Sequence, residues 1–213
     1  MRGHAGAPRW SPDGRYVAFE FRPKEHSEVY VMEVPGGRPR LVPTLPGADN
    51  GGPNWSRDGQ SIYFYSDRGG GHFQLWKVPF RGGSPVQVTR NGGIFGEESS
   101  DGRFLYYSKV VGDGIWKMPL QGGEETHVID RIGNLGWSAW ALGRNGIYFI
   151  GDEDKRSRKT IQFFEFATHQ NIPIWTLEKP GGSGLALSAD RRSLLYDQTE
   201  FSQSNIMLVK NFR

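Results

Sequence analysis

The feature that most constrains the fold of this chain is a short motif that returns five times at nearly constant spacing. Its clearest copy, Arg9–Phe19, joins a strand that ends in Trp10 to an aromatic second strand. The connection is Ser11-Pro12-Asp13-Gly14. Serine first, proline second and glycine last suit a type I β-turn that ends in a residue with positive φ. The motif therefore predicts a β-hairpin.

The same turn recurs from one end of the chain to the other. Its acid, or the residue that replaces it, falls at steps of 45, 43, 44 and 45 residues: Asp13, Asp58, Asp101, Asn145 and Asp190. Glycine follows in four copies (Gly14, Gly59, Gly102 and Gly146), and Arg191 takes its place in the last. We expect these to be structural turn residues. A period in the low forties with turn glycines and short apolar runs is typical of β-propeller blades.

Each repeat contains the strands of one small sheet. We place the blades at approximately 6–46, 47–90, 91–132, 133–179 and 180–213. The first shows the pattern, with strands predicted at 8–11, 16–21, 28–34 and 40–42. The last shows only 185–188, 193–196 and 205–210. The predicted fold is all-β, a propeller of five four-stranded blades of which the last lacks its outer strand.

The missing strand raises the question of how the propeller closes. A propeller closes when one terminus completes the blade that the other terminus begins, and the segment before Pro8 is too short to do so. We therefore expect the chain to be the C-terminal part of a larger ring of roughly six to eight blades. The alternatives are a five-bladed ring without that strand and a ring completed by a second copy. Open blade edges would favour self-association.

Composition narrows the functional classes. The chain has 213 residues, no cysteine and a net charge of +3. The absence of cysteine excludes disulfides, cysteine-bound zinc and thiol catalysis. The basic residues are spread over turns and strand edges, which argues against direct nucleic-acid binding. No apolar segment suits export or membrane insertion. We expect a cytoplasmic protein as written, or a periplasmic one if the N-terminus is truncated.

Catalytic and cofactor motifs are missing from the sequence. The segments Gly136-Trp137-Ser138-Ala139-Trp140 and Gly181-Gly182-Ser183-Gly184-Leu185 both lack the final glycine of a serine-hydrolase elbow. The glycine-rich runs lack the Lys-Ser/Thr of a phosphate loop. The five histidines are scattered without ligand spacing. We therefore predict no enzyme activity, no cofactor and no metal site.

One position departs from the apolar pattern of the repeats. Aligned by their turns, the blades place these residues in the same inner-strand slot: Trp10, Trp55, Glu98, Leu142 and Leu187. A buried carboxylate is costly unless it is paired. We favour a structural pair between Glu98 and a neighbouring cation, or water in the central channel. A channel ligand site at Glu97 and Glu98, such as a weak cation site, is the alternative.

These repeats resemble a known family. Trp-Ser-Pro-Asp-Gly-Arg, followed by an aromatic strand and a strand that ends in Val-Pro-x-x-Gly-Gly, resembles the Pro-Asp repeats of TolB-type β-propellers, relatives of the WD-repeat propellers. Segments 98–109, 122–126, 161–166 and 208–213 resemble large bacterial signalling proteins. In that group the propeller ends the chain behind a winged-helix DNA-binding domain or a Ser/Thr kinase domain. Asn145 and Arg191 depart from the repeat pattern.

The sequence thus supports three functional hypotheses. The first is a non-catalytic propeller that presents its loops to a protein partner or senses a ligand for an attached bacterial regulatory domain. The second is the substrate-gating propeller of a prolyl-oligopeptidase-like hydrolase. The third is a periplasmic TolB-like interaction protein. The partner itself cannot be named from the sequence.

Overall fold

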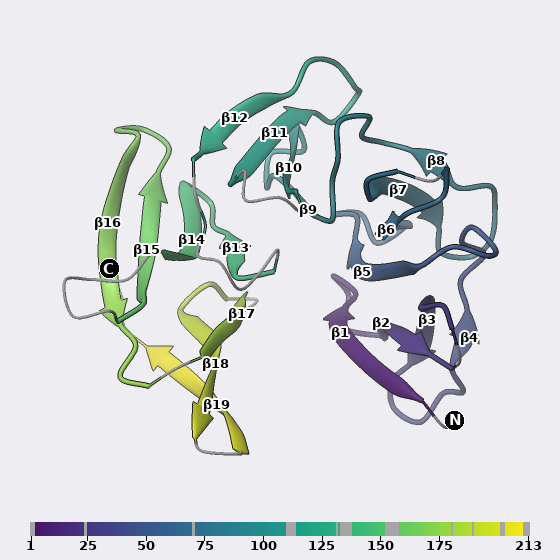
Figure 1. The fold of residues 1–213 in the computed structure, drawn as a ribbon, viewed down its shortest axis with the longest axis horizontal. Coiled ribbons are helices and arrows are strands. Elements are labelled where there is room, and N and C mark those ends of the chain that lie inside the picture. The colour runs from purple at the N-terminus through teal and green to yellow at the C-terminus, as the bar shows by residue number, and fades with distance from the viewer. Residues whose placement is uncertain are drawn as a thin grey trace. The chain divides into compact units, whose positions relative to one another are not determined.

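The fold consists of small antiparallel sheets that follow one another along the chain (Figure 1). The computed structural model describes residues 3–23, 25–69, 71–109, 114–130, 132, 138–151, 158–179, 181–188, 190–200 and 203–210. Within these residues every regular element is a β-strand. Four sheets contain four strands and the fifth contains three. The predicted all-β propeller fold, with a last blade that lacks its outer strand, is confirmed.

The first two sheets have the same strand order as the chain. The first consists of β1 (His4–Trp10), β2 (Tyr16–Arg22), β3 (Glu28–Glu33) and β4 (Arg40–Leu41). The second consists of β5 (Asn50–Trp55), β6 (Ser61–Ser66), β7 (Gln74–Pro79) and β8 (Val86–Gln87). In both sheets the fourth strand is very short and forms an edge, which limits pairing with foreign strands.

The remaining sheets repeat this order. The third consists of β9 (Phe95–Glu98), β10 (Phe104–Ser108), β11 (Ile115–Pro119) and β12 (Thr126–Ile129). The fourth consists of β13 (Trp140–Leu142), β14 (Gly146–Gly151), β15 (Thr160–Glu165) and β16 (Gln170–Thr176). The fifth consists of β17 (Gly181–Leu187), β18 (Ser193–Glu200) and β19 (Gln203–Lys210). The sequence predicts the inner strand of the fourth blade at 136–142, and its residues 136 and 137 lie outside the described residues, as do 211–213 at the end of the chain.

The inner strands β1 and β5 begin earlier than the sequence predicts. The prediction for the first blade is 8–11, and the same repeat pattern predicts 53–56 in the second, whereas β1 starts at His4 and β5 at Asn50. In both, the register with the next strand shifts at a β-bulge, between Gly6 and Arg9 and between Gly51 and Asn54. A bulge interrupts the alternation of inward and outward residues. The sequence pattern therefore showed only the part of each strand that follows the bulge.

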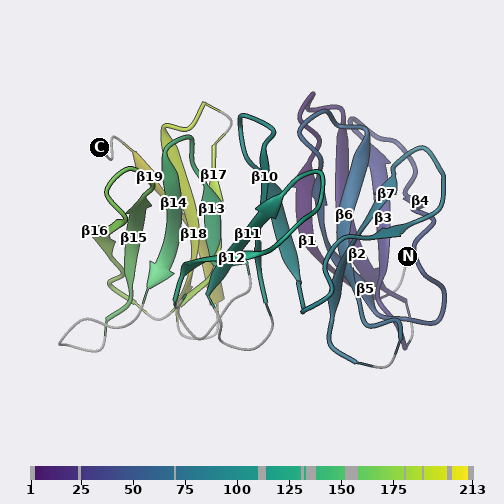
Figure 2. The ribbon, with the colours of Figure 1, turned by 90° about the horizontal axis from the view of Figure 1, so that it is seen from above.

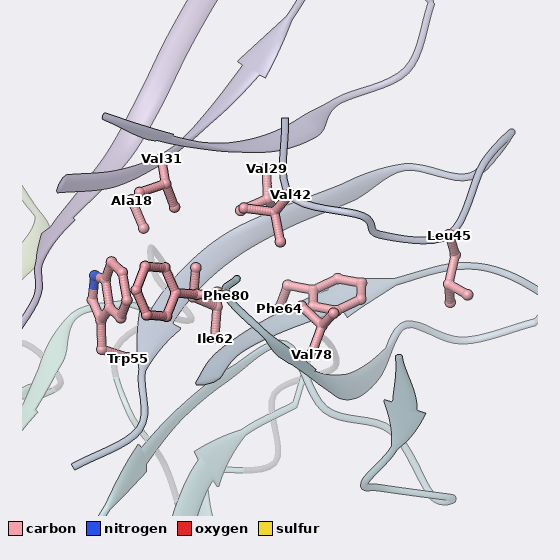
Figure 3. Packing of buried hydrophobic residues seen from close by; sticks show 10 residues of the cluster. All are labelled: Ala18, Val29, Val31, Val42, Leu45, Trp55, Ile62, Phe64, Val78 and Phe80. Carbon is pink, nitrogen blue, oxygen red and sulfur yellow. The ribbon is translucent and has the colours of Figure 1, made fainter. Parts of the chain in front are cut away.

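Side chains from the first two sheets form one core (Figure 3). At one end of this core the Trp55 ring packs against two other aromatic rings. Its centroid lies 5.2 Å from that of Phe80 and 6.3 Å from that of Tyr16. The Trp55 indole N–H donates to the carbonyl of Arg9 at 3.0 Å. The other members are Ala18, Val29, Val31, Val42, Leu45, Ile62, Phe64 and Val78. Burying this apolar and aromatic surface is the main force that holds the two sheets together.

The chain divides into two compact units. One comprises residues 1–110 and 117–126, and the other comprises 111–116 and 127–213. The first unit contains the first two sheets, whose strands lie in layers, in purple and blue (Figure 2). The second contains the fourth and fifth sheets with their own core of Ala139, Ile150, Ile161, Leu177, Leu185, Leu194 and Tyr196. The division runs through the third sheet, not between two predicted blades.

Candidate binding site

Four of the five predicted turns share one set of hydrogen bonds. In each, the serine hydroxyl donates to the aspartate carboxylate two residues later at 2.6 Å. That carboxylate accepts the backbone N–H two residues further on, at 3.0 or 3.1 Å. The acids are Asp13, Asp58, Asp101 and Asp190. These hydrogen bonds hold the pKa of each carboxyl below its ordinary value, and the bond from the serine hydroxyl has the largest effect.

The residue after the acid adopts a left-handed conformation in all four turns. In the first three it is Gly14, Gly59 or Gly102, with φ of 69°, 68° and 71°. In the fifth sheet it is Arg191, with φ of 60°. A side chain in this region costs about 1 kcal/mol relative to glycine. The turn of the fifth sheet therefore keeps the conformation without the residue best suited to it.

The fourth turn is different from the others. The Gly143 N–H donates to the Gly146 carbonyl at 2.8 Å, so only Arg144 and Asn145 form the turn. Asn145 thus does not occupy the place of the turn aspartate, and Gly146 begins β14 without a positive φ. Gly146 is constrained instead by space, because a Cβ there would collide with the Phe164 carbonyl.

Glu98 ends β9, and its side chain is 6% exposed. Its Oε1 accepts the Tyr63 hydroxyl at 2.7 Å and the Lys77 ammonium at 3.3 Å. Its Oε2 accepts the backbone N–H of Arg57 at 2.9 Å. All three donors belong to the second sheet or its turn. The cation that the sequence led us to expect beside Glu98 is therefore Lys77, and the group links the second sheet to the third. A ligand role for Glu98 stays a prediction.

The tyrosine of this cluster is a fixed donor. Burial raises the pKa of Tyr63, and the hydrogen bond to Glu98 raises it further. The Lys77 ammonium also lies 4.9 Å from the centroid of the Tyr63 ring. We call Glu98, Tyr63 and Lys77 the Glu98 cluster. In it the lysine neutralises the charge of the sheltered carboxylate, and the tyrosine hydroxyl donates a further hydrogen bond to it.

Glu97 has different neighbours from Glu98. It pairs in register with Tyr106 of β10, and its charge acts on Arg9 of β1. Burial lowers the pKa of Arg9, and the charge of Glu97 opposes that shift. Adjacent residues of a strand point to opposite faces of the sheet. The structure therefore does not bring the two predicted carboxylates together in one site.

A second cluster of the same residue types was missed by the sequence analysis. Glu125 Oε1 accepts the Lys109 ammonium at 2.8 Å and the Asn91 amide at 3.3 Å, and Oε2 accepts the Tyr107 hydroxyl. Burial alone would raise the pKa of Glu125, but these hydrogen bonds bring it below its ordinary value. Burial and the bond to Glu125 raise the pKa of Tyr107. We call this group the Glu125 cluster.

The Glu125 cluster opens onto a groove. The groove has a volume of about 710 Å³ and is lined by 87–91 on one side and 122–125 on the other, with Tyr107 and Met118. Lys109 and Glu125 are 9% and 22% exposed. The sequence contains the segment Gly122-Gly123-Glu124-Glu125, but no spacing rule connects it with a tyrosine and a lysine on another strand.

In the described ranges, neither a group of metal ligands nor a membrane-spanning helix is found. There, no three histidine, aspartate or glutamate side chains are grouped so that they could hold a metal ion. Nor does any helix in the same ranges have the length and apolar character needed to cross a bilayer.

The sheets, their order and their aspartate turns define a β-propeller built from Pro-Asp-type repeats. Residues 1–179 match the family model described as the TolB beta propeller domain. The chain belongs to this family. The resemblance of the repeats to TolB-type propellers, noted from the sequence, is thereby confirmed.

Relatives share only parts of their length with this chain. An uncharacterized protein of Agrobacterium fabrum is 30% identical over 139 residues, which are 60% of this chain and 47% of that protein. An uncharacterized peptidase of Bacillus subtilis is 44% identical over 57 residues, which are 26% of this chain and 8% of that protein. The chain therefore matches less than half the length of either relative.

Solved structures show the same fold. The crystal structure of TolB from Acinetobacter baumannii superimposes with a TM-score of 0.79 at 15% identity, over 99% of this chain and 52% of that one. A structure from an analysis of two prolyl endopeptidases superimposes with a TM-score of 0.63 at 15% identity, over 97% of this chain and 34% of that one. At these identities the likeness concerns the fold alone, and both structures are larger than the part that matches.

Proposed function

We propose that this chain is a non-catalytic binding propeller that presents its grooves to a protein partner. The observation that carries the proposal is that both sheltered carboxylates are occupied by hydrogen bonds from within the chain. Glu98 and Glu125 each accept hydrogen bonds from a lysine and a tyrosine, so neither is poised as a base or a nucleophile. Such pairs fix the framework on which variable surfaces are displayed.

The groove at the Glu125 cluster is a suitable surface for this role. Its walls come from a loop that follows an edge strand and from a hairpin with two glycines, Gly122 and Gly123. Glycines let a partner backbone approach closely. Arg90 and Glu124 add one charge of each sign at the rim, which favours a polar protein surface over a small apolar ligand.

We also propose that this propeller is part of a larger protein. The resemblance of the C-terminal segments to bacterial signalling proteins supports a sensory propeller attached to a winged-helix or kinase domain. The 57-residue match to a Bacillus subtilis peptidase, at 44% identity, favours a second candidate, the gating propeller of a peptidase. The coding DNA on both sides of this segment distinguishes them: a hydrolase domain would support the second and a regulatory domain the first. A cytoplasmic location stays a prediction.

A crosslinking experiment tests the binding role. A photo-activatable residue is placed at Glu124 in the groove and, as a control, at Arg103, which is also exposed and lies on a turn. We expect a defined protein adduct from position 124 only. The purified chain is also incubated with aminoacyl and prolyl-peptide arylamides, and we expect no hydrolysis above buffer. Equal adducts from both positions, or hydrolysis by the pure chain, would contradict the proposal.

A further inference from the structure

A second groove in the first unit is lined by arginines. It has a volume of about 440 Å³ and lies where the end of β3 and the strand β4 meet the loop after β7. Arg38, Arg40 and Arg81 line it, together with Tyr16 and Phe80. These arginines come from two separate parts of the chain. In the sequence they are scattered surface charges, because only the packing of the first sheet on the second brings them together.

Two of the guanidinium groups are held by the same aromatic ring. The Cζ atoms of Arg40 and Arg81 lie 5.3 Å and 5.1 Å from the centroid of Phe80. Phe80 is itself fixed in the core, 5% exposed and 5.4 Å from the Tyr16 ring. The backbone of Arg40 is paired with Val31 in the first sheet. Cation–π contact with a fixed ring limits where these two charges can lie.

The positive charge of the groove is not compensated. Within the described residues, Arg38, Arg40 and Arg81 form no ion pair with a carboxylate. The single carboxylate in the lining, Glu33, lies 3.5 Å from Arg15. The groove thus presents three guanidinium groups to solvent, and its one carboxylate is paired with Arg15 instead of with them.

We propose that this groove binds the carboxylates of a short acidic segment in a partner protein. Guanidinium groups bind carboxylates with two parallel hydrogen bonds, which gives both affinity and orientation. Acids border the groove: Asp13 and Asp58 line the adjoining hollow, and Glu33 lines the groove itself. A long phosphate backbone would meet these acids along its length, whereas a segment with one or two carboxylates needs to contact only the arginines. The inference rests on the proposed function, because it specifies what kind of partner this propeller holds.

The test uses direct binding. A short fluorescein-labelled peptide rich in glutamate is titrated with the chain at low salt, and fluorescence anisotropy is recorded. The same peptide with glutamine in place of glutamate is the ligand control. We expect the acidic peptide to bind, the glutamine peptide not to bind, and binding to weaken as salt is added. The double variant Arg40→Gln/Arg81→Gln should bind about tenfold more weakly.

A matched variant separates the groove from net charge. Arg57→Gln/Arg103→Gln removes two exposed arginines elsewhere, and Arg103 also lies over an aromatic ring, Phe104. We expect this variant to bind within about twofold of the unchanged chain. Circular dichroism of both variants checks that the sheets are intact, since all four side chains are exposed.

Three results would overturn the inference. The first is failure of the acidic peptide to bind. The second is equal weakening by the two double variants, which would mean diffuse attraction. The third is tighter binding of a short single-stranded DNA or of inorganic phosphate with the same dependence on Arg40 and Arg81, which would assign the groove to phosphate. None of these affects the crosslinking result at Glu124, so the broader proposal fails or survives separately.

Discussion

The Glu98 cluster and the Glu125 cluster contain the same three residue types, yet they are placed differently. Glu98 is 6% exposed and also accepts a backbone N–H from the neighbouring turn. Glu125 is 22% exposed, accepts a side-chain amide and borders a groove. The lysines show the reverse order, because Lys77 is 35% exposed and Lys109 only 9%.

We infer from this difference that the exposure of the acid decides how much each cluster contributes to stability. If Glu125 loses one donor, water can reach its carboxylate and replace the lost hydrogen bond. Water barely reaches Glu98, so loss of one of its donors leaves a sheltered charge without compensation. The Glu98 cluster therefore connects the second sheet to the third, whereas the acid of the Glu125 cluster lies beside a groove.

The largest effect should come from removing the acids. Glu98→Leu leaves Tyr63, Lys77 and the Arg57 N–H without their acceptor, so we expect a loss of about 2–4 kcal/mol in the free energy of unfolding. Glu125→Leu should cost somewhat less, about 1–3 kcal/mol, because the groove admits water to part of the site although Lys109, which is 9% exposed, loses its counter-charge. Urea denaturation measures both. A gain in stability for Glu98→Leu would break the comparison, and such a gain without loss of ligand binding would also rule out the ligand role.

Removing the lysines should give the next largest difference. Lys77→Met leaves the sheltered carboxylate of Glu98 without a counter-charge, and we expect a cost of about 1–3 kcal/mol. Lys109→Met should cost about 0.5–1 kcal/mol although Lys109 is the more buried lysine, since solvent reaches its acid. The same denaturation assay applies. If the order of the two variants were reversed, burial of the lysine, not of the acid, would control these clusters.

Removing the hydroxyls should affect both clusters alike. Tyr63→Phe and Tyr107→Phe each delete one donor from a buried ring, and each should cost about 1 kcal/mol. Double-mutant cycles with Glu98→Gln and Glu125→Gln would measure the coupling of hydroxyl and carboxylate. A difference between the two cycles of more than about 1 kcal/mol would mean that exposure of the acid also sets the strength of the hydroxyl bond.

The smallest effect should appear on acidification. The pKa of Glu125 is lower in the folded chain than its ordinary value. Its contribution is therefore fully present above the unfolded value and is lost as the pH falls through the folded one. Unfolding curves between about pH 6 and about pH 3 should show a steeper loss for the unchanged chain than for Glu125→Gln. Parallel curves would contradict the assignment.

The sequence predicted the sheets better than it predicted the clusters. Turns are local, so Ser11, Asp13 and Gly14 reveal their hydrogen bonds through spacing alone. Bonds between sheets are not local: Tyr63 is 35 residues from Glu98, and Lys77 is 21 residues away. An unexpected acid in an apolar slot could indicate that a partner was needed, but not which lysine would supply it.

The fourth turn shows the limit of reading local motifs. Asn145-Gly146 follows the period of the other turns, and this spacing predicts a variant of the Asp-Gly turn. The structure instead makes a shorter, two-residue connection, in which Arg144 and Asn145 form the turn and Gly146 begins β14. A spacing rule cannot distinguish the two, because the choice depends on which residues of β13 and β14 pair.

The aspartate turns also bear on how such a chain emerges from the ribosome. Every sheet is assembled from strands that are consecutive in the chain, and each aspartate turn is secured by side chains within six residues of one another. A repeat can thus close on itself while the following one is still being synthesised. The tryptophan of the next repeat then has to pack only against the sheet that formed just before it, as Trp55 packs against Tyr16. Contacts of such short reach favour rapid, stepwise folding.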